Sequence, residues 1–130
     1  MSHDIATLLM RNLMDVFGEG DAARRRAVVD EIFNEDAVFI EPHGIYRGRD
    51  EISRIAGVIR ATHPTFRYSP IAPAEELHGL AGRLRWVAGN PGEPPAYAGT
   101  DFVVARDGRI AAVYLFFDGE PDPTGAPIVA

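Results

Sequence analysis

The chain has 130 residues, 46% of them apolar, and a formal net charge of −6. This length fits one compact domain. The sequence contains no cysteine, no lysine and only three serines, which excludes disulfides and catalysis by a thiolate, a Schiff-base lysine or an elbow-type serine. Its 13 basic residues are all arginine and are scattered apart from the run 24–26, so no nucleic-acid partner is expected.

The remaining reactive groups are carboxylates, four histidines and four tyrosines, which are the groups of proton-transfer chemistry. We therefore expect no cofactor. The histidines are not spaced as a metal set, so no metal is expected either. The first residues lack the basic segment of a signal peptide, and no apolar run approaches the ~20 residues that cross a bilayer. These features predict a cytoplasmic protein without a membrane partner.

The first part of the chain shows helical periodicity. Apolar residues recur at i, i+3 and i+4 through residues 4–18, and Gly18 and Gly20 end the pattern. Asp21 is placed to cap a second helix, whose apolar stripe extends to Phe33. The sequence thus predicts two helices before the first strand.

Strand patterns dominate the rest of the chain. A first strand is predicted at 37–42 and a turn with a short extended piece at 44–48. A third helix around 52–59 ends before Pro64. Further extended segments are predicted at 65–72, 76–88, 95–105 and 109–118.

Helices followed by antiparallel strands indicate an α+β domain. We expect three helices packed on one face of a curved, mainly antiparallel sheet, which would enclose a conical pocket. The domain would span residues 1–118, and 119–130 would form a tail rich in proline and glycine.

Glu41 ends the first predicted strand. Alternation along Val38, Phe39 and Ile40 turns this carboxylate inward, where it must find a partner, shift its pKa or do chemistry. His43 lies two residues on, where it either orients Glu41 or is simply hydrated at the strand end.

The last hairpin decides where Asp101 points. If residues 107–108 form a two-residue turn, Asp101 pairs with Tyr114 and faces a wet or intersubunit surface. If 106–108 form a three-residue loop, Asp101 pairs with Val113.

The second register would place Asp101 on an apolar wall. Burial there would raise the pKa of its carboxyl, so that Asp101 could stay protonated near neutral pH and donate a hydrogen bond. This wall would carry Tyr97, Gly99, Val103, Ala111, Val113, Leu115 and Phe117.

These residues resemble the nuclear transport factor 2-like superfamily, in particular its SnoaL-like and ketosteroid-isomerase-like branches, over nearly the whole chain to Asp118. The fold implied is the cone-shaped one of that superfamily. The motifs that carry the resemblance are Glu35-Asp36-Ala37, Glu41-Pro42-x-Gly44, Gly48-x-x-x-Ile52, Asp107-Gly108-Arg109-Ile110 and the following Leu-Phe-Phe-Asp.

The resemblance implies roles for two carboxyl groups. Glu41 matches the general base of ketosteroid isomerases, and Asp101 matches the protonated aspartate that helps to hold the oxyanion. The oxyanion-binding tyrosine of those enzymes falls on Leu13, which leaves Tyr46 and Tyr68 as candidates to replace it.

We therefore expect a pocket for a small apolar molecule and carboxylate-based proton transfer of the isomerase, cyclase or lyase type. The alternative is a non-catalytic ligand-binding or dimerisation module of the same fold. Trp86 fits either the core or the pocket wall. The expected catalytic residues are Glu41 and Asp101, and the expected ligand-binding residues are His43, Tyr97, Val113, Leu115, Phe117, Leu13, Phe17 and Trp86.

A homodimer is expected through the exposed face of the sheet, as the resemblance implies. The alternate side chains of the last two strands would supply this face, namely Phe102, Val104, Ala112, Tyr114 and Phe116.

Overall fold

A computed structural model describes residues 3–118, and the predicted tail lies outside the described residues. The helical elements are α1 (Ile5–Arg11), η1 (Asn12–Phe17), α2 (Ala22–Ile32) and α3 (Gly48–Thr62). The strands are β1 (Phe33–Glu41), β2 (Gly44–Arg47), β3 (Arg67–Pro70), β4 (Glu75–Leu77), β5 (Ala81–Gly89), β6 (Tyr97–Arg106) and β7 (Arg109–Phe117).

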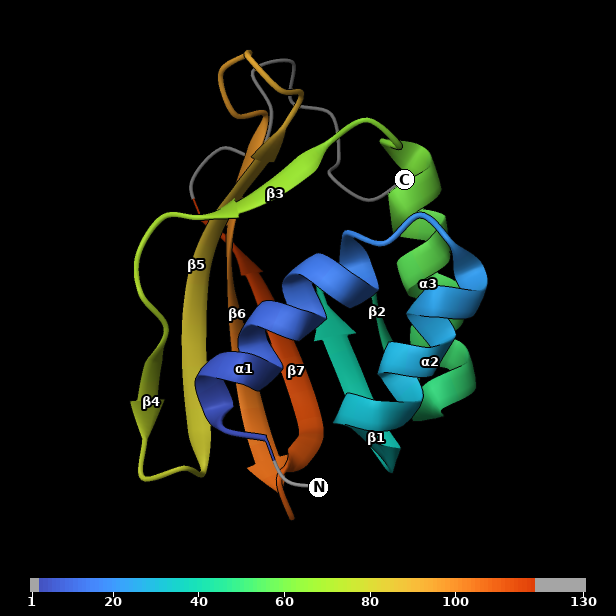
Figure 1. Ribbon diagram of the computed structural model, residues 1–130, viewed down its shortest axis with the longest axis vertical. Coiled ribbons are helices and arrows are strands. Elements are labelled where there is room, and N and C mark those ends of the chain that lie inside the picture. Colours follow the sequence, from blue (N-terminus) through green and yellow to red (C-terminus); the bar gives the residue numbers. More distant parts are fainter. Residues whose placement is uncertain (1–2, 119–130) are drawn as a thin grey trace.

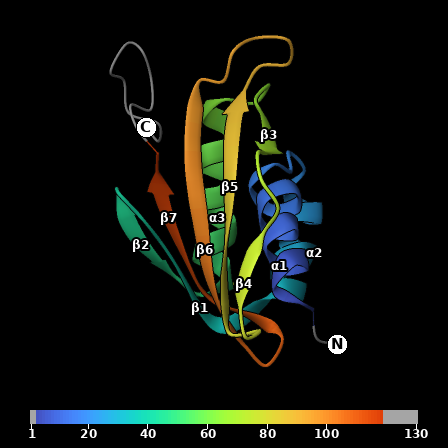
Figure 2. The same ribbon diagram turned by 90° about the vertical axis from the view of Figure 1, so that its left-hand side faces the viewer.

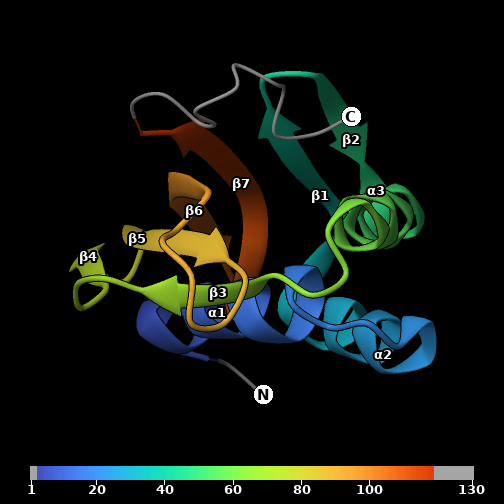
Figure 3. The same cartoon turned by 90° about the horizontal axis from the view of Figure 1, so that it is seen from above.

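The strands form one mixed sheet with the order β2-β1-β7-β6-β5-β3, and β4 pairs with β5 (Figure 1). Only the β1–β7 pair is parallel among the described strands. Seen from above, the sheet bends around the helices and stays open (Figure 3). The expected α+β architecture of three helices on a curved sheet is therefore confirmed.

The core lies between the concave face of the sheet and the helices. Figure 2 shows helices on this face and no helix of the described residues on the opposite face. The largest fully buried side chains come from both layers and include Leu8, Leu9, Ile32, Phe33, Phe39, Ile52, Leu84 and Ile110. Among the described residues, no helix combines the length and apolar character needed to span a bilayer.

The first helix changes its geometry halfway. Asp4 caps α1 by accepting a hydrogen bond from the Thr7 amide at 2.7 Å. From Asn12 onward the helix widens to the π form, whose last bond runs from the Gly18 amide to the Leu13 carbonyl at 2.9 Å. π segments are rare in proteins, and those that occur often lie at functional sites. The wider turn brings four buried residues to the core side, namely Asn12, Leu13, Val16 and Phe17.

Two element boundaries differ from the prediction. Phe33 is extended and begins β1, although its apolar spacing had placed it on the second helix. The predicted strand 76–88 is divided, because His78 and Gly79 both adopt positive φ, at 53° and 67°, and turn the chain between β4 and β5.

The predicted cap at Asp21 is confirmed. Its side chain accepts a hydrogen bond from the Arg24 amide at 2.8 Å.

The β6–β7 hairpin follows neither predicted register. Asp107 and Gly108 form a two-residue turn, both at positive φ, as a type I′ turn requires. One extra residue, Ala111, then bulges from β7, so that Asp101 pairs with Leu115. Because the bulge offsets the pairing by one residue, Asp101 turns to the concave face.

Candidate functional site

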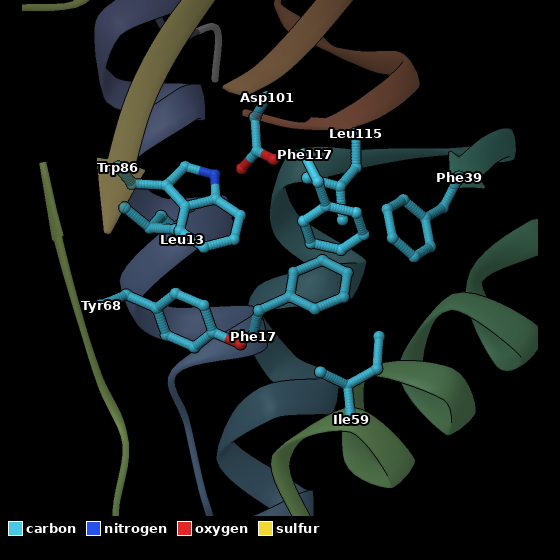
Figure 4. Close-up of a pocket in the computed structure, with 9 residues that line it drawn as sticks. All are labelled: Leu13, Phe17, Phe39, Ile59, Tyr68, Trp86, Asp101, Leu115 and Phe117. Carbon is cyan, nitrogen blue, oxygen red and sulfur yellow. The ribbon is translucent and has the colours of Figure 1, made fainter. Parts of the chain in front are cut away.

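A cavity lies between η1, α3 and the concave face of the sheet, and we call it the Asp101 cavity (Figure 4). It holds about 380 Å³ of empty space, part of it open to solvent. The space is narrow, because only about 30 Å³ of it admits the centre of a water molecule. A ring-sized ligand would therefore have to displace wall side chains. The wall consists of Leu13, Phe17, Phe39, Ile59, Tyr68, Trp86, Asp101, Leu115 and Phe117.

Asp101 supplies the carboxyl group of this wall. Its position in β6, between Leu84 of β5 and Leu115 of β7, leaves it 4% exposed. Burial raises the pKa of the Asp101 carboxyl to about 7, against a smaller opposite effect from the neighbouring Trp86 and Asn12 side chains. At neutral pH the group is therefore present in both its protonated and its ionised form.

Tyr68 supplies the hydroxyl of the wall. It comes from β3, and its ring packs edge-on against Trp86 with ring centroids 5.2 Å apart. Burial, with a smaller contribution from Asp101, raises the pKa of Tyr68 to about 12, so the phenol keeps its proton. Its hydroxyl makes no hydrogen bond to any described residue. It is thus an unused donor at the cavity.

Trp86 lies flat across β6 because residue 99 has no side chain. A Cβ atom on Gly99 would stand 2.5 Å from Trp86 Cζ2. Figure 4 shows the indole nitrogen turned toward the Asp101 carboxyl. Trp86 is 4% exposed, and its Nε1 does not reach hydrogen-bond geometry with any described group.

Asn12 lies at the start of η1 and is completely buried. Neither its Nδ2 nor its Oδ1 meets hydrogen-bond geometry within the described part of the chain. Its carboxamide is nevertheless close enough to Asp101 to favour the ionised carboxyl. A buried amide without partners costs stability, commonly about 1–3 kcal/mol.

Glu41 lies in a second depression on the other side of two cavity residues. Its Oε2 accepts a hydrogen bond from the His43 backbone N–H at 2.8 Å, and its Oε1 accepts one from the Tyr46 hydroxyl at 2.9 Å. As predicted, Glu41 points inward and is 6% exposed. The Glu41 depression is lined by Ile40, Glu41, Pro42, Tyr114, Leu115, Phe116 and Phe117.

The register relates the two carboxyl groups. Phe39 pairs with Val113 in the parallel β1–β7 ladder, and continuing this register by two residues sets Glu41 beside Leu115. Leu115 in turn pairs with Asp101. Glu41 on β1 and Asp101 on β6 therefore lie on either side of Leu115 of β7, with Cα atoms roughly 10 Å apart.

The structure brings six of the ten predicted site residues together in the Asp101 cavity, namely Leu13, Phe17, Trp86, Asp101, Leu115 and Phe117. The other four lie elsewhere. Glu41 lines the neighbouring depression, and Val113 is fully buried in the core. The Tyr97 hydroxyl lies 3.0 Å from His63 Nε2. His43 is exposed and contacts Glu41 through its backbone.

The sequence analysis missed Asn12, Phe39 and Ile59 as site residues. Asn12 carried a usable signal, because it follows Leu8 and Leu9 at helical spacing and is the polar residue in that apolar stripe. Phe39 and Ile59 carried none beyond their apolar character. Within the described residues, no group of three His, Cys, Asp or Glu side chains could hold a metal ion.

Comparison with known proteins gives a consistent result. A family model described as a SnoaL-like domain matches residues 10–113. A candidate isomerase of the SnoaL-like family from Agrobacterium tumefaciens superposes with a TM-score of 0.81 at 27% identity, covering 88% of this chain and 97% of that chain.

Two further solved structures share the fold. A candidate SnoaL-like polyketide cyclase from Jannaschia has a TM-score of 0.65 and 16% identity, covering 91% of this chain and 90% of its own. A candidate polyketide cyclase from Sinorhizobium meliloti has a TM-score of 0.62 and 21% identity, covering 82% and 90%. No curated protein matches the chain.

Proposed function

Because the chain belongs to the SnoaL-like domain family, we propose that it is a cofactor-independent acid–base enzyme acting on a small apolar ligand. The reaction would be of the isomerase, cyclase or lyase type. One observation supports the proposal above all: the Asp101 carboxyl is buried in a largely apolar cavity with a pKa of about 7. A buried carboxyl that keeps its proton close to neutral pH can donate a hydrogen bond to an oxyanion.

The proposed roles follow from the two depressions. Glu41 would take a proton from the carbon next to a ligand carbonyl, and the electron pair of that C–H bond would move onto the carbonyl oxygen as an enolate. Protonated Asp101 would donate a hydrogen bond to this oxygen. Glu41 would then return the proton to another carbon atom, which completes an isomerisation without any co-reactant.

Tyr68 is the phenol that we propose as the second oxyanion donor. Its hydroxyl is at the cavity and has no described partner, whereas the Tyr46 hydroxyl already donates to Glu41. The Tyr97 hydroxyl lies against His63, outside the cavity wall. Tyr68 would thus take the place of the donor that the sequence lacks at Leu13.

Leu115 and Phe117 stand between Asp101 and Glu41, because both residues line both depressions. A ligand that contacts the two carboxyl groups would have to displace these side chains. This arrangement favours a flat, apolar ligand with one ketone oxygen.

The test is exchange of carbon-bound hydrogen. The chain is incubated in D₂O with a panel of apolar cyclic ketones, and deuterium uptake beside the carbonyl is followed by NMR. We expect E41Q and D101N to slow the exchange at least about 100-fold. The matched control is D107N, which changes an exposed turn residue at positive φ that asparagine tolerates.

Binding is measured in parallel through the fluorescence of Trp86, the sole tryptophan. Ketones that bind without exchange would identify a non-catalytic ligand-binding module, the competing function. If neither E41Q nor D101N altered binding or exchange of any ketone, the assignment of both carboxyl groups would be wrong.

We also propose that a second copy of the chain covers the convex face of the sheet. Phe116, Val104 and Tyr114 are 57%, 42% and 37% exposed there, and Phe102 stacks edge-on against Phe116. Ala112 of the predicted face is buried. Contiguous exposed apolar patches mark association surfaces. Sedimentation should show a dimer that F116E converts to a monomer; a wild-type monomer would refute this.

A further inference from the structure

Three polar side chains meet behind the Asp101 cavity, and two of them have no other partner. Asn12 comes from η1, Trp86 from β5 and Asp101 from β6, and each is at most 4% exposed. The Asn12 carboxamide and Trp86 Nε1 lack hydrogen-bond partners among the described residues. Native proteins seldom leave such groups buried and unpaired, so an unpaired set calls for a functional explanation.

We propose that Asn12 and Trp86 are positioning residues for Asp101. They hold its carboxyl group in place whether it is protonated or ionised. The indole N–H of Trp86 points to the carboxyl (Figure 4) and serves its ionised form. The Asn12 carboxamide offers an N–H to the ionised form and a carbonyl oxygen to the proton of the neutral form. Together they can hold the Asp101 carboxyl in its protonated and in its ionised form.

The backbone supports this reading. Trp86 pairs with Gly99 across β5 and β6, and only glycine leaves room for the indole to lie over that strand. The π turn of η1 brings Asn12 to the buried side together with Leu13. Both local features, a side-chain gap in a strand and a widened helix, thus direct a donor toward the same carboxyl.

Apart from burial, Trp86 and Asn12 are the neighbours that act on the pKa of the Asp101 carboxyl. Of the described residues that line the cavity with Asp101, only Tyr68 is also titratable. Tyr68 stays neutral, since its pKa is about 12. The charge of Arg60 in α3 acts on Tyr68, whose pKa it lowers slightly against the larger effect of burial. The cavity residues facing Asp101 from η1 and β7 are Leu13, Phe17, Leu115 and Phe117, which carry no charge.

The experiment follows the Asp101 carboxyl directly by ¹³C NMR titration of the full chain, with D101N to assign its signal. Trp86→Phe removes the N–H and keeps an aromatic ring. We expect the titration midpoint of Asp101 to rise by about one to two pH units, because the ionised carboxyl loses the indole N–H that faces it and favours it. Gly99→Ala keeps the N–H but displaces the indole, and it should move the midpoint in the same direction.

Asn12→Leu removes both a donor to the ionised form of Asp101 and an acceptor of its neutral form. The titration midpoint of Asp101 should therefore rise by less in N12L than in W86F. N34L is the matched control, because the Asn34 side chain donates a hydrogen bond to the Arg106 carbonyl and lies outside the cavity. The titration midpoint of Asp101 in N34L should equal that in the wild type. Thermal melting establishes that each variant is folded.

An unchanged Asp101 midpoint in both W86F and G99A would overturn the role of the indole. An unchanged midpoint in N12L would overturn the role of Asn12, even if the variant melted at a lower temperature. The catalytic meaning of this positioning role rests on the proposed function, but the titration measures the role without any enzyme activity. Shifted midpoints in a chain that exchanges no ketone would remove the proposed function and leave the positioning role intact.

Discussion

Replacing Asp101 by asparagine should stabilise the protein at neutral pH and have a smaller effect in acid. The carboxyl has a pKa of about 7 in the folded chain, against an ordinary value of 3.8. Asparagine has nearly the same shape and cannot ionise. The variant therefore isolates the cost of keeping an ionisable group in the cavity.

The sign follows from proton binding. Below about pH 4 Asp101 is protonated in both folded and unfolded chains, so it adds no pH dependence. As the pH rises from 3.8 toward 7, the unfolded chain loses this proton and the folded chain keeps it, which favours unfolding. Above the folded pKa both forms are ionised and the full cost remains. A shift of about three units corresponds to about 4 kcal/mol.

The assay is urea unfolding of wild type and D101N at a series of pH values, followed by far-ultraviolet circular dichroism. The difference in unfolding free energy should grow by about 4 kcal/mol in favour of D101N between about pH 4 and pH 8. D107N should track the wild type throughout. A D101N difference that stays constant over this range would mean that Asp101 ionises like an exposed carboxyl, and the reasoning would fail.

Three other substitutions probe the site. Y68F should lower ketone exchange about 100-fold and leave urea stability unchanged, since the hydroxyl lacks a described partner; equal exchange rates would exclude Tyr68 as a donor. L115A should join the two depressions, admit bulkier ketones and cost about 2 kcal/mol of unfolding free energy; fluorescence titration showing the same ligand range as the wild type would contradict its separating role. Y46F removes the donor to Glu41 Oε1 and should cost about 2 kcal/mol; unchanged urea stability would mean that this hydrogen bond contributes nothing.

The order of elements could be predicted because periodicity is a local property. The helix at 4–18, the cap at Asp21 and the inward direction of Glu41 all follow from spacing along a few turns or one strand. The face that carries Asp101 could not be decided in the same way. It depends on a single bulged residue, Ala111, that alternation does not reveal.

The composition of the cavity was only partly predictable for a related reason. Leu13, Phe17 and Trp86 show their burial through local pattern, and the structure places them in the cavity wall. Tyr68 was one of two tyrosines that sequence could not distinguish. The choice depends on β3 crossing to β5, a contact between segments that are distant along the chain.

The two carboxyl groups are chemically distinct although they lie on the same concave row. Glu41 accepts two well-formed hydrogen bonds, from the His43 amide and the Tyr46 hydroxyl. Asp101 receives none of comparable geometry from any described residue, and its pKa is raised. Two acids in such different surroundings are suited to opposite roles, one accepting a proton and one donating a hydrogen bond. Exchanging the two residue types would not exchange these roles, because the surroundings of each carboxyl group set its role.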